Sequence, residues 1–312
     1  MKAWVEAWQD ALYGPRGFYR SPAGPRAHFS TATHGPAGRL LAEALLRLAD
    51  DRGLAHVVDI GAGRGELLEH LYAARPALRL TGLDVVARPE GLPAPVEWLV
   101  SPGGAGLPEG LRDLDRVLVL AHEWLDVVPC PVAEVDDEGR LRHRLVEPDT
   151  GTEEWGPPVA GVELAWAGHH WFTTTPGDRV EIGTTRDAAW QDLLARIGSG
   201  VAIAVDYGHT GGDRPAQGTL AAYKEGVVVA PVPDGTCDLT AHVAMDSLDH
   251  DDLLDQRTLL RGLGVDGRVP PLELARRDPQ GYLRELQRAS AAAALTDPGG
   301  FGGFLWAVKE LG

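Results

Sequence analysis

Apolar residues near the start of the chain recur every three or four positions, which is the spacing of one face of a helix. The first such run consists of Trp4, Val5, Trp8, Ala11 and Leu12. A second run begins near Pro36 and ends at Gly53. Its apolar face is formed by Leu40, Leu41, Leu45 and Leu48. Proline is common in the first turn of a helix and glycine just past the last turn. The pattern therefore predicts two N-terminal helices.

From residue 55 onward, continuous apolar runs alternate with helical or irregular segments. Such runs, rich in Val, Leu and Ile, are typical of strands that are buried on both faces. The predicted strands are 55–60, 78–84, 95–100, 115–121 and 200–206. Helical spacing predicts helices over 64–75 and 185–197. This alternation predicts an α/β fold with a mostly parallel sheet covered on both faces.

The pattern changes between residues 130 and 183. Two apolar runs, Pro131 to Val135 and Leu141 to Val146, flank Asp-Asp-Glu-Gly, which is a hairpin signal. Further short strands are predicted at 169–174 and 179–182. This segment is therefore expected to be a β-rich insertion.

Three units follow from these patterns. They are a helical N-terminal extension (1–54), a core made of 55–129 and 184–312, and the insertion (130–183). After residue 246 the spacing is mostly helical until a predicted closing strand at 304–308.

The segment Val57-Val-Asp-Ile-Gly-Ala-Gly-Arg-Gly65 carries the strongest chemical signal. An apolar strand that closes on alternating glycines turns into a helix through a loop without Cβ atoms, so a ligand can lie against the backbone. The candidate cofactor-binding residues of this segment are Asp59, Gly61, Gly63 and Gly65. Asp84 ends the next apolar run and is placed to bind a ribose.

The glycine spacing separates two classes of cofactor. A dinucleotide fingerprint has glycines at offsets of zero, two and five, and the third position would here be Glu66. The observed offsets of zero, two and four, with an acid after the next strand, resemble motifs I and II of class I S-adenosylmethionine-dependent methyltransferases. The resemblance implies S-adenosylmethionine as cofactor, with the loop at its methionine end and Asp84 on both ribose hydroxyls.

The predicted strand at 115–121 ends in His122-Glu-Trp-Leu-Asp-Val-Val-Pro129. Ligands of open α/β sheets bind outside the carboxyl ends of strands, so this segment is expected beside the glycine loop, with His122 at the cofactor. If the chain turns helical here, Glu123 and Asp126 project to neighbouring positions and could hold a cationic acceptor such as a guanidinium. The alternative is that both acids favour a helix N-terminus electrostatically.

Asp206 and Tyr207 follow the predicted strand at 200–206 and are expected at the same edge of the sheet. They are candidates for the acceptor pocket, and the alternative is a capping aspartate with a packed tyrosine. A zinc-protease motif would need a second histidine at position 126, which is aspartate. The other histidines lack metal-ligand spacing, so no metal site is predicted.

Composition and charge limit the partners. The formal charge of −16 argues against a protein that grips nucleic acid, because phosphate binding depends on clustered lysine and arginine. Two cysteines, Cys130 and Cys237, are too few for a disulfide framework. The sequence has no run near eighteen apolar residues and no signal-peptide pattern. We therefore expect a cytoplasmic protein without a membrane span.

Eight segments occur in a characteristic order: 11–19, 29–33, 59–65, 122–129, 205–208, 218–220, 238–243 and 301–309. Together they resemble the MidA-like family, which includes the mitochondrial methyltransferase needed for respiratory complex I assembly. The resemblance implies a class I methyltransferase fold whose added elements cover the cofactor cleft. Because the mitochondrial member is a protein arginine methyltransferase, it also implies a protein substrate. It matches Glu123 and Asp126 to the acidic motif and places Thr31 near the cofactor.

The chain departs from this family pattern at several polar positions. Gln217 stands where an arginine is common, and Asp84 stands where glutamate is frequent, a change that a ribose would tolerate. The acceptor therefore stays open between a protein side chain and a small molecule. A module that binds S-adenosylmethionine without catalysis, as an assembly factor or sensor, is another alternative, and a nicotinamide dehydrogenase is the weakest.

Overall fold

The computed structural model describes residues 1–21 and 32–312. The helices are α1 (Trp4–Tyr13), α2 (Gly35–Asp51), α3 (Glu66–Ala74), α4 (Gly161–His170), α5 (Thr184–Leu194), α6 (Gln256–Gly262), α7 (Leu272–Arg277) and α8 (Pro279–Leu295). Short 3₁₀ turns are η1 (Phe18–Arg20), η3 (Met245–Ser247) and η4 (Phe301–Gly303).

In the described residues the strands form four sheets. They are β1 (Lys2–Ala3), β2 (His56–Ile60), β3 (Arg79–Asp84), β4 (Glu97–Val100), β5 (Val117–His122), β6 (Val132–Val135), β7 (Leu141–Val146), β8 (Glu153–Pro158), β9 (Arg179–Glu181), β10 (Gly200–Asp206), β11 (Gly208–His209), β12 (Ala221–Lys224), β13 (Val227–Val229), β14 (Asp238–Thr240), β15 (Val243–Ala244), β16 (Asp252–Asp255) and β17 (Leu305–Leu311).

The largest sheet has seven strands in the order β16-β17-β10-β5-β2-β3-β4. Strands β10, β5, β2, β3 and β4 run parallel, and β17 and β16 add antiparallel pairings at one edge. A second sheet, formed by β1, β6, β7, β8 and β9, has only antiparallel pairings. The expected parallel pairing is therefore found in the central part of the seven-stranded sheet and does not extend to the whole chain.

Successive residues of the central strands point to opposite faces of this sheet. Val57 packs in a core with α2, α3 and α6, whereas Val58 packs in a second core with Trp190 of α5. Both faces are therefore buried, which explains why the strands read as continuous apolar runs.

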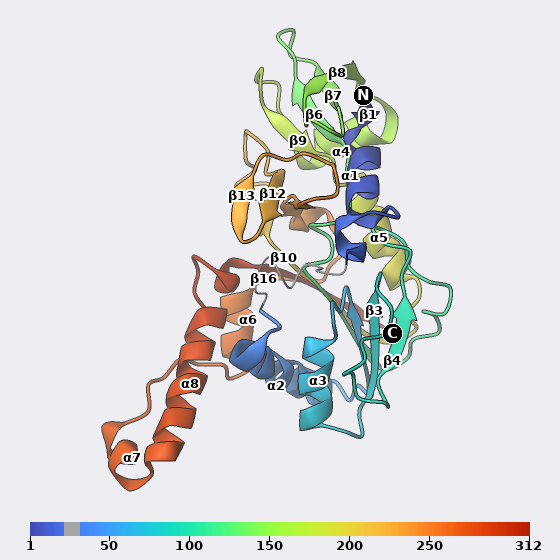
Figure 1. The fold of residues 1–312 in the computed structure, drawn as a ribbon. Coiled ribbons are helices and arrows are strands. Elements are labelled where there is room, and N and C mark those ends of the chain that lie inside the picture. The colour runs from blue at the N-terminus through green and yellow to red at the C-terminus, as the bar shows by residue number, and fades with distance from the viewer. Residues whose placement is uncertain (22–31) are drawn as a thin grey trace.

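The insertion forms a second sheet in which β1 from the N-terminus pairs with β7. Lys2 lies opposite Val146, and Figure 1 shows the N-terminus beside β7 and β8, at the end of the molecule opposite α2 and α3. Helix α1 leads from this sheet toward the carboxyl ends of the central strands, where Trp8 donates a hydrogen bond of 3.1 Å to the Leu239 carbonyl. The N-terminal extension and the insertion thus share one sheet.

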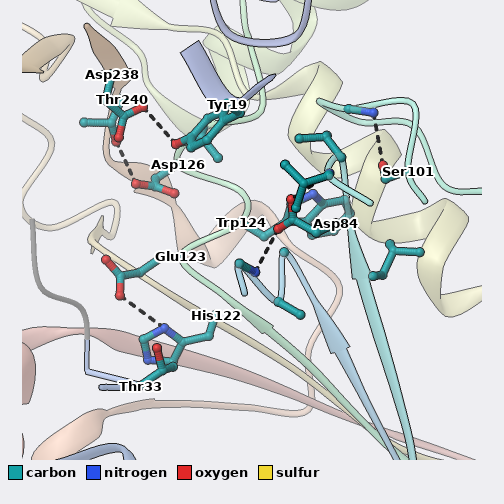
Figure 2. Close-up of a pocket in the computed structure, with 18 of the residues that line it drawn as sticks. Tyr19, Thr33, Asp84, Ser101, His122, Glu123, Trp124, Asp126, Asp238 and Thr240 are labelled. Atoms are coloured by element: carbon teal, nitrogen blue, oxygen red, sulfur yellow. Dashed lines mark hydrogen bonds and ion pairs between the residues drawn. The ribbon is translucent and has the colours of Figure 1, made fainter. Parts of the chain in front are cut away.

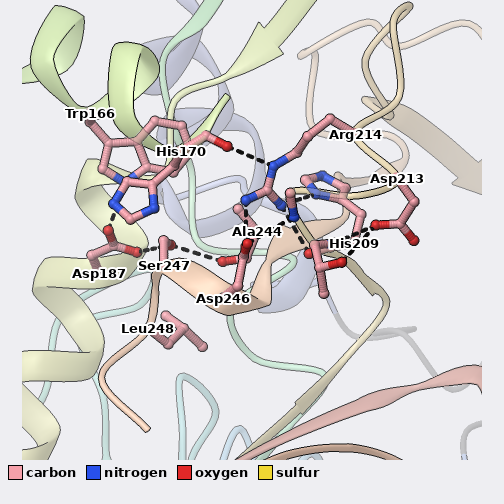
Figure 3. Close-up of polar contacts among 12 residues, drawn as sticks. Trp166, His170, Asp187, His209, Asp213, Arg214, Ala244, Asp246, Ser247 and Leu248 are labelled. Carbon is pink, nitrogen blue, oxygen red and sulfur yellow. Dashed lines mark hydrogen bonds and ion pairs between the residues drawn. The ribbon is translucent and has the colours of Figure 1, made fainter. Parts of the chain in front are cut away.

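A polar network ties the insertion to the core (Figure 3). Arg214 donates to the carbonyls of His170 and His209 and to the Asp246 carboxylate. Beside it, Asp187 of α5 accepts hydrogen bonds from Trp166 and Ser247. The network holds α4 and α5 against the turn that follows β15.

Two predicted elements are wrong. The strand expected at 169–174 is absent, because helix α4 extends to His170 and packs Trp166 and Trp171 into the core of the insertion. The helical reading after residue 246 is interrupted by β16, whose backbone pairs with β17 at the edge of the large sheet. In both segments tertiary contacts decided the type of secondary structure. Within the described ranges, no helix combines the length and apolar character needed to cross a membrane.

Candidate functional site

A cavity of about 370 Å³ lies at the carboxyl ends of β2, β3 and β5, beneath α1, η1 and β14. Ligand pockets in proteins commonly measure roughly 300–1,000 Å³. The cavity brings together Asp59, Gly61, Gly63, Asp84, His122, Glu123, Asp126 and Tyr207 from the predicted set. Gly65 ends the same loop, Asp206 lies behind the wall, and Thr31 falls outside the described residues.

The glycine loop after β2 has a backbone that side chains would strain. Gly61, Gly63 and Gly65 have φ angles of 72°, 59° and 83°, in the left-handed region that favours glycine. A Cβ atom on Gly65 would also lie 2.6 Å from Leu92 Cδ1. The loop therefore presents bare backbone to the cavity immediately before α3.

Asp84 lines the cavity beside this loop. Its Oδ2 atom accepts a hydrogen bond of 2.8 Å from the Gly63 amide, and Oδ1 accepts one from Val86. Burial raises the pKa of Asp84 to about 6. Asp59, on β2 beneath the loop, has its pKa raised to about 8 by burial and by the charges of Asp84 and Glu66.

Ser101 and the two glycines after β4 form a third wall (Figure 2). The Ser101 hydroxyl donates to the Gly106 carbonyl and accepts from the Gly103 amide. Trp124 donates a hydrogen bond of 3.3 Å to the Gly104 carbonyl. These contacts fix a narrow turn beside Asp84.

Glu123 begins the acidic side of the cavity and has a strained backbone. Its φ angle is 53°, which is uncommon for a residue with a side chain. Its amide donates to the Val205 carbonyl at 2.8 Å, and its Oε1 atom lies 3.3 Å from His122 Nδ1. Strained residues cluster at functional sites, where surrounding contacts hold them.

The helical geometry considered for Glu123 and Asp126 is wrong. After β5 the chain makes turns, because the left-handed Glu123 cannot continue a helix and the Leu125 amide donates to the Asp206 carboxylate at 2.9 Å. Both acids nevertheless line the cavity. The turn after β5, and not a helix, brings Glu123 and Asp126 to the same cavity.

Asp126 and Asp238 are both buried acids of the cavity wall. Asp126 Oδ2 accepts a hydrogen bond of 2.7 Å from Thr240, and Asp238 Oδ1 accepts one of 2.8 Å from Tyr19. Figure 2 shows Asp238, Thr240 and Tyr19 above Asp126, with Glu123 and His122 below. Burial raises the pKa of Asp126, and burial together with the Asp126 charge raises the pKa of Asp238 to about 8.

Positive charge beside these acids is limited in the described part of the chain. The guanidinium of buried Arg186 acts on Asp126, but its nitrogens donate to the carbonyls of Val128, His242 and Asp126. Across residues 1–21 and 32–312, no lysine or arginine forms an ion pair with Glu123, Asp126, Asp206 or Asp238. Among the described residues these acids are therefore not paired with a protein cation, which agrees with the raised pKa values of Asp126 and Asp238.

Tyr207 lies at the rim, where its side chain is 39% exposed. Its ring meets Phe304 edge-to-face with centroids 4.2 Å apart and lies nearly parallel to His242 at 5.9 Å. Burial and the neighbouring acids Glu123 and Asp126 raise the pKa of Tyr207, so its hydroxyl keeps its proton at neutral pH.

Several cavity residues were not predicted as site residues from sequence. They are Tyr13, Tyr19, Thr33, Ser101, Asp238, Thr240 and His242. Asp238 and His242 lie in the segment 238–243, which the family resemblance had marked without assigning a chemical role. Across the described residues, no group of three or more His, Cys, Asp or Glu side chains is arranged to hold a metal ion.

Comparison with known proteins agrees with this geometry. Residues 72–256 match the family described as "Putative S-adenosyl-L-methionine-dependent methyltransferase". A COG1565 superfamily member from Burkholderia thailandensis, solved with S-adenosyl-homocysteine bound, is 25% identical, with a TM-score of 0.74 over 98% of this chain and 87% of its own. No curated protein matches the chain significantly.

A native structure of a COG1565 superfamily protein from the same organism shares the fold, with a TM-score of 0.74 at 24% identity over 99% of this chain and 87% of its own. The cavity, with its glycine loop and the carboxylate of Asp84 beside it, fits S-adenosylmethionine. The chain belongs to the family of S-adenosyl-L-methionine-dependent methyltransferases, and it is an enzyme of that class.

Proposed function

We propose that this methyltransferase modifies a protein side chain and that the guanidinium of arginine is its acceptor. One observation carries the proposal: Glu123, Asp126 and Asp238 line the same cavity as the glycine loop. A planar guanidinium carries one positive charge and five N–H donors, which suits several carboxylates around one space. The resemblance to MidA-like proteins, with their mitochondrial arginine methyltransferase, supports the same acceptor.

The cofactor would lie along the glycine loop, with its ribose at Asp84. S-adenosylmethionine supplies an electrophilic methyl group on a sulfonium. The Asp84 carboxylate, already oriented by the amides of Gly63 and Val86, would accept hydrogen bonds from the ribose. Asp59 and the backbone of Gly61, Gly63 and Gly65 would face the methionine end, and His122 would close the cavity beside Glu123. Thr31 remains a candidate from the resemblance alone.

The acids would position the acceptor. Glu123 and Asp126 would bind the guanidinium and aim one nitrogen at the methyl group, while Tyr207 would cover it from the rim. Orientation of two reactants can contribute about 7–11 kcal/mol to lowering a barrier. Placement would therefore account for much of the rate.

Transfer of a labelled methyl group from S-adenosylmethionine to proteins of a cell lysate, followed by mass spectrometry of modified residues, tests the proposal. Methylated arginine is the expected product. Glu123→Gln and Asp126→Asn should each lower labelling while retaining S-adenosylhomocysteine binding, and exposed Glu109→Gln is the matched control. Label on another residue type or only on small molecules would overturn the arginine assignment, and binding without any transfer would favour a sensor or assembly factor.

A further inference from the structure

Asp206 stands directly behind Asp126, at the boundary of the cavity. Asp206 ends β10, and Asp126 lies in the turn after β5, which is the neighbouring parallel strand. The Asp206 side chain is fully buried, and that of Asp126 is 5% exposed by residue. The two carboxyl groups interact directly.

Each carboxyl group has one oxygen satisfied and one left over. Asp206 Oδ2 accepts from the Leu125 amide, and Asp126 Oδ2 accepts from the Thr240 hydroxyl. The two Oδ1 atoms are buried and find no hydrogen-bond donor in the described part of the chain. A buried polar atom without a partner is costly, so a pair of such atoms calls for an explanation.

One proton held between the two carboxyl groups supplies the missing donor. Carboxylates in contact do not both ionise readily, as in the paired aspartates of aspartic proteases. We propose that Asp126 and Asp206 share one proton in the empty enzyme, and that the pair receives the proton which the acceptor nitrogen loses during methyl transfer. The proton transfer rests on the proposed function, whereas the shared proton of the empty enzyme does not.

The groups that face the pair favour proton retention. Burial raises the pKa of both aspartates, and Glu123 adds a like charge from the same turn. Asp238 of β14 lies close enough to interact with Asp126, and Tyr207 and Tyr19 add neutral hydroxyls. Arg186 of α5 opposes these effects, but its guanidinium nitrogens donate to carbonyl oxygens.

The reaction then balances without a further reagent. A bound guanidinium brings a positive charge that replaces the shared proton, which leaves to solvent. During transfer a bond forms between the acceptor nitrogen and the methyl carbon, the carbon–sulfur bond breaks, and its electron pair stays on sulfur. The nitrogen loses one proton to Asp126, which lines the cavity. The pair is thereby returned to its singly protonated state beside a product that is still cationic, and product release is favoured.

The two aspartates have different roles in this scheme. Asp126 touches the acceptor and is the catalytic residue. Asp206 acts through Asp126 and is a positioning residue, since it does not line the cavity. Asp206→Asn keeps an oxygen that can accept from the Leu125 amide, and it replaces the ionisable carboxyl group by a neutral amide that cannot share a proton.

Carboxyl carbon NMR of the full-length enzyme, labelled at aspartate Cγ, tests the shared proton without any substrate. Assignments come from Asp126→Asn, Asp206→Asn and Asp238→Asn. We expect the Asp126 and Asp206 signals to remain short of full ionisation through pH 7, and Asp126 in Asp206→Asn to titrate at a lower pH. Two fully ionised signals from pH 6 upward would overturn the inference.

The pH profile of arginine labelling tests the proton transfer. Asp206→Asn should lower the rate about tenfold or more, within the effect of a general base, and shift the pH profile. Its S-adenosylhomocysteine affinity should be unchanged. The matched control is Asp187→Asn, a buried acid in the network of Figure 3, which should leave the profile unchanged. An unshifted profile in Asp206→Asn would reject the catalytic half.

These two measurements separate the failure of each proposal. If arginine is not methylated in the wild-type enzyme, the proposed function fails, whereas the NMR result stands by itself. If arginine is methylated and the NMR signals show both Asp126 and Asp206 fully ionised, the shared proton is rejected and arginine remains the assigned methyl acceptor.

Discussion

The Tyr19 hydroxyl donates a hydrogen bond of 2.8 Å to the Asp238 carboxylate, so two residues 219 positions apart close one wall of the cofactor cavity. Tyr19 also stacks on Tyr13, with ring centroids 5.5 Å apart. The acidic wall is therefore completed by the N-terminal segment, outside the parallel sheet that carries the glycine loop.

Replacing Tyr19 with phenylalanine keeps the stacked ring and removes this hydrogen bond. The free energy of unfolding, measured with urea, should fall by about 1 kcal/mol, a typical contribution of a hydrogen bond. The KM for the protein acceptor should rise more than the Kd for S-adenosylhomocysteine. Tyr282→Phe on α8 is the control, and equal effects of both variants would contradict a special role for Tyr19.

Asp84→Ala should weaken S-adenosylhomocysteine binding, measured by calorimetry. Hydrogen bonds to charged groups are worth about 1.5–3 kcal/mol, which corresponds to roughly 10- to 100-fold in Kd. The exposed Asp113→Asn should leave the Kd unchanged. Unaltered affinity in Asp84→Ala would place the ribose elsewhere.

The contribution of Asp59 and Asp238 to the stability of the empty enzyme should be lost as the pH rises between about 4 and about 8. Asp59 and Asp238 have pKa values raised to about 8 in the folded state, so the folded protein binds more protons than the unfolded chain in this window. Each unit of raised pKa corresponds to about 1.4 kcal/mol lost by the upper end.

Asp238→Asn should flatten this dependence. The free energy of unfolding of the variant minus that of the wild type should increase by at least about 1.4 kcal/mol from pH 4.5 to pH 8.5, which is the equivalent of one pKa unit. Parallel curves for wild type and variant would show that Asp238 ionises normally.

Gly65→Ala should destabilise the loop through both backbone and packing. The left-handed conformation costs an L-residue about 1–2 kcal/mol, and the new methyl group would collide with Leu92. We expect a loss of at least this size in urea unfolding, together with weaker cofactor binding. Gly91→Ala, at an unstrained position with open space, should change stability by less than about 0.5 kcal/mol. Similar losses in the two variants would contradict the strain argument.

The sequence predicts those parts of the molecule that local pattern controls. Val57 and Val58 read as a buried strand because both faces of the large sheet are covered, and the glycine loop is legible because its φ angles exclude side chains. Asp238 and Ser101 were missed, because their place in the cavity depends on contacts between distant segments. The turn at Glu123 was missed because the Asp206 carboxylate, from another strand, captures the Leu125 amide.

Lys2 of β1 pairs with Val146, and Trp8 of α1 donates a hydrogen bond to Leu239, so the N-terminal segment has partners that are synthesised well after it. On the ribosome, α1 emerges long before these segments exist, and it docks only after most of the chain has been synthesised. Contacts of such long sequence separation slow folding, since the loop between them has to close first. The part of the cavity that α1, η1 and β14 cover is therefore among the last parts of the enzyme to assemble.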